Sequence, residues 1–307
     1  SDSMTVTVTI TGANDAPSIT STADTTAEED VAYAYTTTAS DADTGDTVTL
    51  QCTTVPSWMS CTAGALTGTP ANADVGSHAV VITATDGTAS TTDSFTVVVA
   101  NANDAPTITS TAVTSVDEDA VYSYTVTAND ADGDTLTMTG TTVPSWLTFT
   151  ASTGVLTGTP TNDHVGSHSV VITVADAVSS VTDEFTIVVA NTNDAPTISS
   201  TAVISVNEDA TYTYTVVGDD VDTGDTLTLQ GTDVPSWLTF TAGTGVLTGI
   251  PSNSEVGSHS VTITVVDAAG ATGTQTFTIT VANTNDAPSI SSTAVTAVDE
   301  DSAYSYS

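Results

Sequence analysis

The chain has 307 residues, of which 37 are Asp or Glu and none is Lys or Arg, so its formal charge is −37 at pH 7. Such a charge repels phosphate backbones and anionic lipid head groups, which excludes nucleic acid as a partner. Without Lys or Arg to pair with, the carboxylates can be neutralised only by protons or bound cations, and a divalent cation is the simplest solution.

Apolar and polar residues alternate along most of the chain, in which Val, Ile and Thr dominate and hydrophobic residues make up 39%. This pattern indicates a folded, β-rich chain rather than a disordered one. The sequence has no run of about eighteen apolar residues, and it does not begin with the basic and apolar regions of a signal peptide. We therefore expect no direct membrane insertion in this segment and no export signal within it.

In chain order, the sequence divides at a repeated NDAP, which begins at Asn14, Asn103, Asn193 and Asn285. Residues 1–13 match the last strand of a truncated repeat, and residues 287–307 match the first strands of another. The three whole repeats between them occupy residues 14–104, 105–194 and 195–286. We interpret the chain as a window cut from a longer array. The alternative is self-assembly by strand donation at the two ends.

Each whole repeat carries the same landmarks in the same order: a Tyr-x-Tyr strand, VPSW, LTG, VGSH and a last strand that leads to NDAP. Alternating runs such as 122–128, 170–176 and 185–191 predict about seven strands in some ninety residues. No helical period competes with them. The sequence therefore predicts an all-β chain, a tandem array of immunoglobulin-like β-sandwich domains of about ninety residues each.

One tryptophan in each repeat follows the proline of VPSW, at Trp58, Trp146 and Trp237. We interpret it as the large aromatic side chain that fills the core of a small sandwich. A tryptophan that stacks on a sugar is the alternative.

Only the first repeat contains cysteine, and Cys52 and Cys61 are the two ends of the loop CTTVPSWMSC. The other two repeats have glycine and phenylalanine at these positions. Because both positions became cysteine together, we predict a disulfide and an oxidising compartment. The alternative is a pair of small, unbonded hydrophobic side chains.

Acidic residues recur at fixed distances from the Asn of NDAP. A glutamate falls fifteen residues later, at Glu29, Glu118, Glu208 and Glu300. Two aspartates fall twenty-seven and twenty-nine residues later, as Asp41 and Asp43, Asp130 and Asp132, and Asp220 and Asp222. Another aspartate ends a predicted strand, at Asp86, Asp176 and Asp267. All of these acids occupy predicted loops rather than strand faces.

The loops of an antiparallel sandwich lie alternately at its two ends. Acids from one repeat, from the connecting NxNDAP and from the next repeat can therefore converge at a joint. Ca²⁺ takes about six to eight oxygen ligands in a tolerant geometry, whereas Mg²⁺ prefers to keep its waters. The spacing predicts calcium between successive repeats. Solvated Asp-rich turns are the alternative.

The segments VPSWLTFTASTGVLTGTP (143–160), VGSHSVVITVAD and NxNDAP give the chain a specific resemblance. It resembles cadherin-like tandem repeats, in particular the dystroglycan-type cadherin-like or "putative Ig" repeats of large bacterial surface proteins. The resemblance covers all three whole repeats and both partial ends. It implies cadherin-like β-sandwich domains with Ca²⁺ at the joints between them.

The resemblance also implies which residues bind the ions. The first joint would use Glu29, Asn101, Asn103, Asp104, Asp130, Asp132 and Asp176. The second joint would use Glu118, Asn191, Asn193, Asp194, Asp220, Asp222 and Asp267. The matching residues before the first repeat are Asn14, Asp15, Asp41, Asp43 and Asp86, and those after the third are Glu208, Asn283, Asn285 and Asp286.

The chain departs from the family pattern in three ways. Asn stands at the first linker position, where the family often has Asp, and Ala replaces the second Asn of the family linker, as at Ala105. An acidic pair typical of cadherins is reduced to single acids, Asp74, Asp163 and Glu255. These departures favour one or two ions per joint rather than the three that the resemblance implies.

These features lead to one functional hypothesis. We expect a calcium-rigidified stalk or filament segment of a secreted or cell-surface, adhesin-like prokaryotic protein. Its expected partners are calcium, neighbouring repeats and other copies in a filament. The alternative is an adhesive module that binds a glycan or protein. An enzyme is not expected, because no histidine is paired with a nucleophile and the carboxylates recur in every repeat rather than once in a cleft.

Overall fold

The structure, a computed structural model, describes residues 2–307. Within these residues it contains no α-helix, and each whole repeat forms one domain with nine strands and one three-residue 3-10 helix. The predicted all-β class is therefore confirmed. The strands outnumber the expected seven because predicted strands are interrupted, as where β3 and β4 of the first domain are separated by residues 37–38. None of the helices in residues 2–307 is long and apolar enough to cross a membrane.

The elements of the first domain are β1 (Ser18–Ile19), β2 (Thr26–Glu28), β3 (Tyr33–Thr36), β4 (Ala39–Ser40), β5 (Thr49–Thr54), β6 (Met59–Thr62), β7 (Ala65–Gly68), η1 (Asn72–Asp74), β8 (Gly76–Thr85) and β9 (Ser90–Ala100). Those of the second domain are β10 (Thr107–Ile108), β11 (Ser115–Asp117), β12 (Tyr122–Thr125), β13 (Ala128–Asn129), β14 (Thr137–Thr142), β15 (Leu147–Thr150), β16 (Val155–Gly158), η2 (Asn162–His164), β17 (Gly166–Ala175) and β18 (Ser180–Ala190). Those of the third domain are β19 (Thr197–Ile198), β20 (Ser205–Asn207), β21 (Tyr212–Thr215), β22 (Gly218–Asp219), β23 (Thr228–Asp233), β24 (Leu238–Thr241), β25 (Val246–Gly249), η3 (Asn253–Glu255), β26 (Gly257–Val266) and β27 (Thr272–Ala282).

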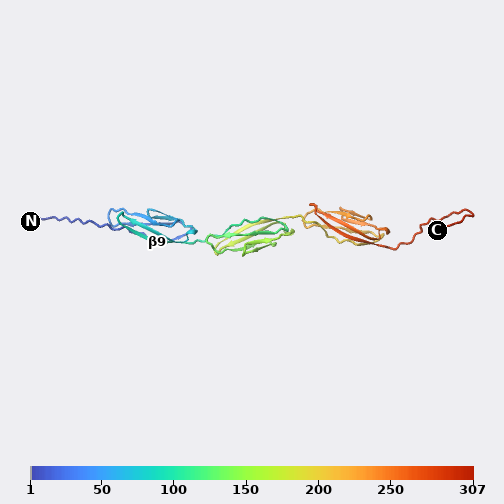
Figure 1. The fold of residues 1–307 in the computed structure, drawn as a ribbon, viewed down its shortest axis with the longest axis horizontal. Coiled ribbons are helices and arrows are strands. Elements are labelled where there is room, and N and C mark those ends of the chain that lie inside the picture. Colours follow the sequence, from blue (N-terminus) through green and yellow to red (C-terminus); the bar gives the residue numbers. More distant parts are fainter. Residues whose placement is uncertain (1) are drawn as a thin grey trace. The chain divides into compact units, whose positions relative to one another are not determined.

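The strands pair in the same way in every domain. In the first domain a four-stranded sheet has the order β2-β9-β8-β5, a three-stranded sheet has the order β3-β7-β6, and β1 pairs with β4. The second and third domains repeat these orders. β2 runs parallel to β9, with Ala27 opposite Val99, whereas the long β8–β9 pair is antiparallel. Figure 1 shows β9 leaving the first domain toward the residues that connect it to the second.

The core of each domain follows from the alternation within its strands. Val80, Ile82 and Ala84 point inward from β8 and are fully buried, as is Val97 of β9. Successive side chains of a strand point to opposite faces, so one face of each sheet is apolar and packs on the other sheet. Each fully buried Val or Ile side chain contributes about 1.5–3 kcal/mol. The equivalent positions of the other domains are buried in the same way.

The tryptophans are partly buried and pack against the core of each domain, which agrees with their interpretation as core residues, although they are not its most buried members. Trp146 packs edge-on against Tyr122, with ring centroids 5.9 Å apart, while the next residue, Leu147, is buried. The Gly of LTG is required here, because a Cβ on Gly158 would lie 2.1 Å from the carbonyl oxygen of Trp146. This close approach explains why VPSW and LTG recur together.

Cys52 of β5 and Cys61 of β6 form a disulfide, with their Cα atoms 6.3 Å apart. β5 and β6 are outer strands of different sheets, so this bond joins the two sheets at one side of the sandwich. In the second domain the corresponding residues are Gly140 and Phe149, and a Cβ on Gly140 would lie 3.3 Å from the Phe149 ring. The phenylalanine therefore fills the space that the disulfide occupies in the first domain.

Residues 2–16 and 283–307 form no strand. Val6, Val8 and Ile10 alternate like the inward residues of β9, yet they are exposed, because no second strand pairs with them. At the other end Tyr304 donates to the carbonyl of Val295 (2.8 Å), as Tyr33 donates to Asp24 (2.6 Å). The assignment of residues 1–13 and 287–307 to partial repeats stays a prediction, and Ser1 lies outside the described residues.

The described residues form two compact units. The first holds the first domain and most of the second domain. The second unit holds the third domain together with residues 117–119, 161–165 and 190–194, which lead into it. The residues of the first joint therefore lie within one unit, and the loop acid Glu118 belongs to the same unit as the linker that follows β18.

Candidate metal sites at the domain joints

Two linkers connect the three domains, residues 101–104 (the first linker) and 191–194 (the second linker). Both are held to the preceding domain through a backbone N–H at their second position. Thr192 donates to Glu118 Oε1 at 2.6 Å, and Ala102 donates to Glu29 in the same way. The buried glutamate of each domain thus binds the start of the linker that follows the domain.

The end of each linker is held by the following domain. In the second linker the side chain of Asn193 donates to Asp267 Oδ2 (2.8 Å), and the backbone N–H of Asp194 donates to Asp222 Oδ2 (2.7 Å). In the first linker the corresponding bonds go from Asn103 to Asp176 (3.2 Å) and from Asp104 to Asp132 (2.7 Å). These contacts give a physical reason for the recurrence of Asn-Asp before the buried proline.

The glutamate of each domain is buried directly after the second strand. Glu29, Glu118 and Glu208 are only 1%, 3% and 2% exposed. Their own N–H groups bond to the last residue of the neighbouring long strand, as where Glu118 donates to Ala190 (2.9 Å). The next residue, such as Asp119 at φ 58°, has the left-handed conformation that turns the chain. This turn fixes the glutamate at the end of the sandwich.

One oxygen of each buried glutamate lacks a donor. Within residues 2–307, Oε2 of Glu29, Glu118 and Glu208 is buried with no hydrogen-bond partner. Leaving a buried carboxylate oxygen without a donor is costly, so such an oxygen indicates a proton, a bound water or an ion. These atoms are the strongest structural indication of a cation at the domain ends.

The first joint places further acids around this oxygen. Ligand atoms of Glu29, Asp30 and Asp104 lie within 4.8 Å of one another. Burial raises the pKa of Glu29, and the negative charge of Asp132 raises it further, although the N–H of Ala102 acts in the opposite direction. Asp30 was not among the predicted ligands. The second joint has a related cluster of Glu118, Asp194 and Asp222, again within 4.8 Å, in which an aspartate of the next domain takes the place of the residue after the glutamate.

A second type of cluster lies within the loops of one domain. Its members are Asp41, Asp43 and Asp46 in the first domain, Asp130, Asp132 and Asp134 in the second, and Asp220, Asp225 and Asp267 in the third, with ligand atoms within 4.8 Å. Oδ2 of Asp130 and Oδ2 of Asp220 are buried without a hydrogen-bond partner among the described residues. Burial raises the pKa of Asp225, and the charges of Asp220 and Asp267 add to the effect.

Sequence reasoning missed the third acid of these loop clusters. Asp46, Asp134 and Asp225 each follow a glycine with a positive φ, at Gly45, Gly133 and Gly224. Gly-Asp therefore recurs shortly after the predicted aspartate pair in every whole repeat. That recurrence was available in the sequence, but Gly-Asp is also an ordinary turn dipeptide.

Hydrogen bonds from backbone N–H groups and asparagine amides stabilise several of the aspartates in their charged form. The N–H groups of Ser179 and Val178 lower the pKa of Asp176, and the Asn193 side chain does so for Asp267. The pKa of Asp222 is lowered, chiefly by the Asp194 N–H and also by the Asn191 amide. These bonds fix the direction of the carboxylates and leave them charged at neutral pH.

Other predicted residues play different roles. Asn101 is exposed and donates to the neighbouring carbonyl of Ala102 (3.3 Å) rather than toward the acids. Two of the single acids cap their own 3-10 helices, since Asp74 accepts the N–H of Ala71 (3.1 Å) and Glu255 accepts that of Ser252 (2.9 Å). In the second domain His164, and not Asp163, accepts the corresponding N–H of Thr161 (3.1 Å). These acids therefore do not take the place of the acidic pair of cadherins.

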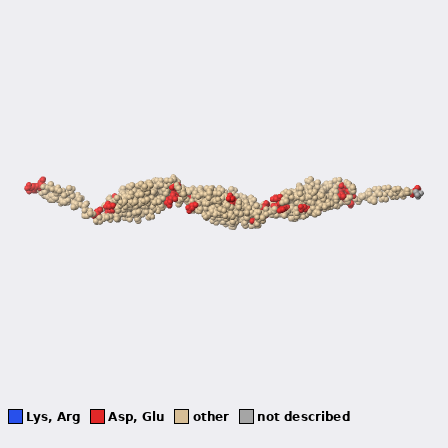
Figure 2. Space-filling model, turned by 180° about the vertical axis from the view of Figure 1, so that it is seen from behind, with Lys and Arg blue, Asp and Glu red and all other residues tan. Residues whose placement is uncertain are grey.

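The start of the first domain and the end of the third domain each carry the contacts of only one side of a joint. Before the first domain, Asn14 donates to Asp86 (3.0 Å) and the Asp15 N–H donates to Asp43 (2.7 Å). After the third domain, Glu208 Oε1 accepts the amide of Asn283 (2.6 Å), while Asn285 donates to the carbonyl of Asp286 (3.3 Å). In Figure 2 the acids gather where domains begin and end, and the strand faces in view carry little charge.

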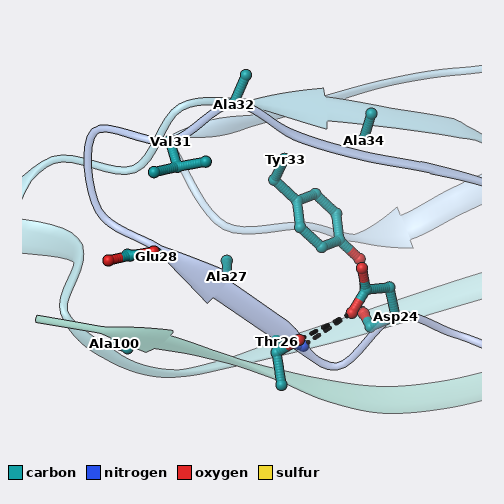
Figure 3. A pocket seen from close by; sticks show the side chains of 9 residues that line it. All are labelled: Asp24, Thr26, Ala27, Glu28, Val31, Ala32, Tyr33, Ala34 and Ala100. Atoms are coloured by element: carbon teal, nitrogen blue, oxygen red, sulfur yellow. Dashed lines mark hydrogen bonds between the residues drawn. The ribbon is translucent and has the colours of Figure 1, made fainter.

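A pocket also opens in the first domain between β2 and β3 (Figure 3). Ala27 lines it, whereas the larger Val116 and Val206 stand at this position in the other domains. Tyr33 donates to the carbonyl of Asp24, and the Asp24 side chain accepts from both the N–H and the hydroxyl of Thr26 at 3.1 Å. The polar groups of Asp24, Thr26 and Tyr33 are thus bonded within this set and do not pair a nucleophile with a base.

The chemistry of the joint clusters fits a hard divalent cation. Every ligand atom of these clusters is a carboxylate oxygen, and neither sulfur nor a histidine nitrogen belongs to a cluster among the described residues. Oxygen donors of this kind suit Ca²⁺ or Mg²⁺ better than zinc or copper. The structure thus brings together Glu29, Asp104 and Asp132 at the first joint and Glu118, Asp194 and Asp222 at the second.

The chain is similar to adhesin repeats. It is 31% identical over 146 residues, or 47% of its length, to the serine-rich adhesin for platelets of Staphylococcus aureus. It spans about 6% of the length of that relative.

Its fold is similar to that of cadherin domains. Extracellular cadherin domains 1–5 of protocadherin gamma B2 match with a TM-score of 0.57 and 18% identity, over 90% of this chain and 61% of that chain. An endo-fucoidan hydrolase of glycoside hydrolase family 107 matches at 26% identity over 77% of this chain and 39% of that chain, but with a TM-score of only 0.29.

A family model described as "Putative Ig domain" matches residues 16–100, 105–190 and 195–282. These three matches cover most of the chain and coincide with the three sandwiches. The resemblance to cadherin-like and Ig-like repeats is thereby confirmed. The chain belongs to the Putative Ig domain family, with three tandem domains of cadherin-like fold.

Proposed function

We propose that the joints of this chain bind Ca²⁺ and that the chain serves as a calcium-stiffened stalk or filament segment of an adhesin-like surface protein. The observation that carries the proposal is the buried glutamate before each linker. Glu29 and Glu118 each have one oxygen without a donor, next to acids of the linker. No Lys or Arg side chain can pair with this group, because the chain contains neither residue.

Two sets of residues would hold the ions at each joint. At the first joint one set is Glu29, Asp30, Asp104 and Asp132, and the other is Asp130, Asp132 and Asp134, with Asp176 nearby through Asn103. Two clusters support about two ions per joint. The bound cation would supply the positive charge that the chain itself lacks.

The acids would couple the orientation of adjacent domains. Without neutralisation, Glu118 of one domain and Asp222 of the next repel each other across a short linker, which favours orientations that separate them. When their charge is neutralised, the orientation that brings them together becomes the favoured one. The chain then loses bending freedom at each joint.

A spacer fits this geometry better than an adhesive role for one domain. The same contacts recur at both joints, whereas a dedicated binding domain would need a distinct surface. A relative of this chain is named as a platelet adhesin, and this chain corresponds to a small part of it. We therefore assign the chain to the extracellular stalk of such a protein rather than to its ligand-binding part.

Small-angle scattering and calorimetry on the full chain test the proposal. We expect Ca²⁺ to bind with measurable heat, to lengthen the particle and to raise its melting temperature, while Mg²⁺ at the same concentration does so weakly. The double variant Glu29→Gln, Glu118→Gln is the control and should lose most of the response. A scattering profile that is the same in excess Ca²⁺ and in excess chelator would contradict the proposal.

A further inference from the structure

An asparagine of the first domain makes a direct contact with an acid of the second. Asn72 is the first residue of η1, and its Nδ2 donates to Asp132 Oδ1 at 2.9 Å. The same Nδ2 lies 3.5 Å from Asp104 Oδ2 in the first linker. At the second joint Asn162, the first residue of η2, donates to Asp222 Oδ1 at 3.1 Å. Neither asparagine belongs to the predicted ion sites.

The asparagine is held on a well-supported turn. The carbonyl of Pro70 accepts the N–H of Asp30 at 2.8 Å, and the carbonyl of Asn72 accepts that of Val75 at 3.2 Å. His78 Nε2 lies 2.6 Å from the carbonyl oxygen of Asp74, which closes the other side of the turn. The backbone position of Asn72 is therefore set by its own domain, at the end of the sandwich that faces the first linker.

The accepting aspartate is equally fixed. Asp132 Oδ2 takes the N–H of Asp104 at 2.7 Å, and the Asp132 N–H donates to Asp130 Oδ1 at 3.0 Å. Oδ1 of Asp132 is thus left for the Asn72 amide. Asp222 has the same arrangement, with its Oδ2 taken by the Asp194 N–H and its own N–H bonded to Asp220 Oδ1 (2.9 Å).

The chemistry of the pair needs no cation. An amide NH₂ facing a carboxylate forms a charge-assisted hydrogen bond, whereas the amide oxygen or a carboxylate at this position would face Asp132 with repulsion. The orientation with Nδ2 toward Asp132 is the one that satisfies both groups. An amide here therefore attracts the next domain in the absence of metal.

We propose that Asn72 and Asn162 form an ion-independent latch between successive domains. Each asparagine amide holds an aspartate of the next domain, so a metal-free joint retains part of its preference for this orientation against the repulsion between its acids. The latch and the calcium clusters act on the same orientation, but the latch does not depend on cation binding.

The third domain offers an internal control. Asn253 is the first residue of η3 and corresponds to Asn72, but it is more exposed and reaches only Asp286, at 3.4 Å. Residues 287–307 form no strand, so no folded domain presents an aspartate to it. A substitution at Asn253 changes the same type of turn without removing an interdomain contact.

The test uses single-molecule energy transfer on the full chain, with dyes on non-canonical residues at the exposed positions Thr92, Thr182 and Thr272, used in adjacent pairs. In excess chelator, Asn72→Ala should lower the ratio of ordered to disordered first joints about tenfold, as expected for a hydrogen bond to a charged group. Asn162→Ala should do the same at the second joint only. Asn253→Ala should change neither.

A second variant separates the latch from folding and from calcium. Asn72→Asp places a carboxylate opposite Asp132, so the joint should become disordered in chelator and regain order when Ca²⁺ is added. Domain folding is followed in parallel by circular dichroism.

If Asn72→Ala and Asn162→Ala match the wild type in chelator, the latch is wrong. If the wild type ignores Ca²⁺ while the asparagine variants still loosen the joint, the latch stands and the proposed function fails.

Discussion

Equivalent buried glutamates lie at the second joint and at the outer end of the third domain, but the acids around them differ. Glu118 and Glu208 are both almost fully buried, and each accepts a linker N–H through Oε1, from Thr192 at 2.6 Å and from Thr284 at 2.5 Å. Around Glu118 two more acids lie within 4.8 Å, whereas no cluster of three acids includes Glu208 in residues 2–307. Burial of the glutamate therefore comes from its own domain and linker, and the crowding of charge comes from the next domain.

The contacts that a domain makes with the linker before it also form when no folded domain precedes that linker. The Asp15 N–H binds Asp43 at 2.7 Å, the same distance as from Asp194 to Asp222, although no folded domain precedes residue 15 in the described chain. A joint is thus two separately formed halves that share one linker. Only the carboxylate cluster and the asparagine latch depend on both halves.

The largest effect is expected when the glutamate is changed in a complete joint. Glu118→Ala should weaken Ca²⁺ binding at the second joint about 100-fold, because it removes the ligand that lies between the domains. Glu208→Ala, the matched variant at the outer end, should leave both joints unchanged. Isothermal titration of the full chain measures the difference. Equal losses in the two variants would show that the glutamate acts on the domain fold and not on the joint.

A smaller effect is expected from the loop clusters, which one domain forms largely by itself. Asp134→Asn in the second domain and Asp46→Asn in the first should each weaken one class of Ca²⁺ site about tenfold, to a similar extent. The comparison matters because Asp134 lies beside a joint and Asp46 lies at an outer end. A loss confined to Asp134→Asn would mean that the loop cluster also needs the preceding domain.

The smallest expected effect is that of pH on the stability of metal-free protein, which is prepared by dialysis. The pKa of Glu29 is raised above its ordinary value of 4.5, so the protonated form is favoured in the fold, and the stability that it contributes is lost as pH rises through the raised pKa. The pKa values of Asp86, Asp176 and Asp267 are lowered from 3.8, so their contribution is lost as pH falls below that value.

These opposite shifts predict a maximum of metal-free stability near pH 4, between the two ordinary values. The melting temperature should rise slightly from pH 7 to that maximum and then fall. Saturating Ca²⁺ should remove the rise, because the cation already neutralises the joint acids. A melting temperature that only decreases from pH 7 downward would rule out a raised pKa at the joint.

Much of this architecture could be predicted because it repeats. Every whole repeat has a glutamate fifteen residues after the Asn of NDAP and aspartates twenty-seven and twenty-nine residues after it. Their common role was therefore visible without a structure. The strand class followed from the alternation of Val, Ile and Thr. The motif VPSW indicated a large aromatic residue of the core, but it did not show that Trp146 stays partly buried and packs edge-on against Tyr122.

The sequence by itself determined the repeat unit, the all-β class and the acids that recur in register, since these depend only on spacing along the chain. Only the tertiary structure decided that Asn72 faces Asp132, that Asn101 faces solvent and that Asp134 joins the loop cluster. The physical reason is that these contacts depend on which loops meet at one end of a sandwich and on the direction of single side chains. Residues sixty positions apart in the chain carry no local signal of such a contact.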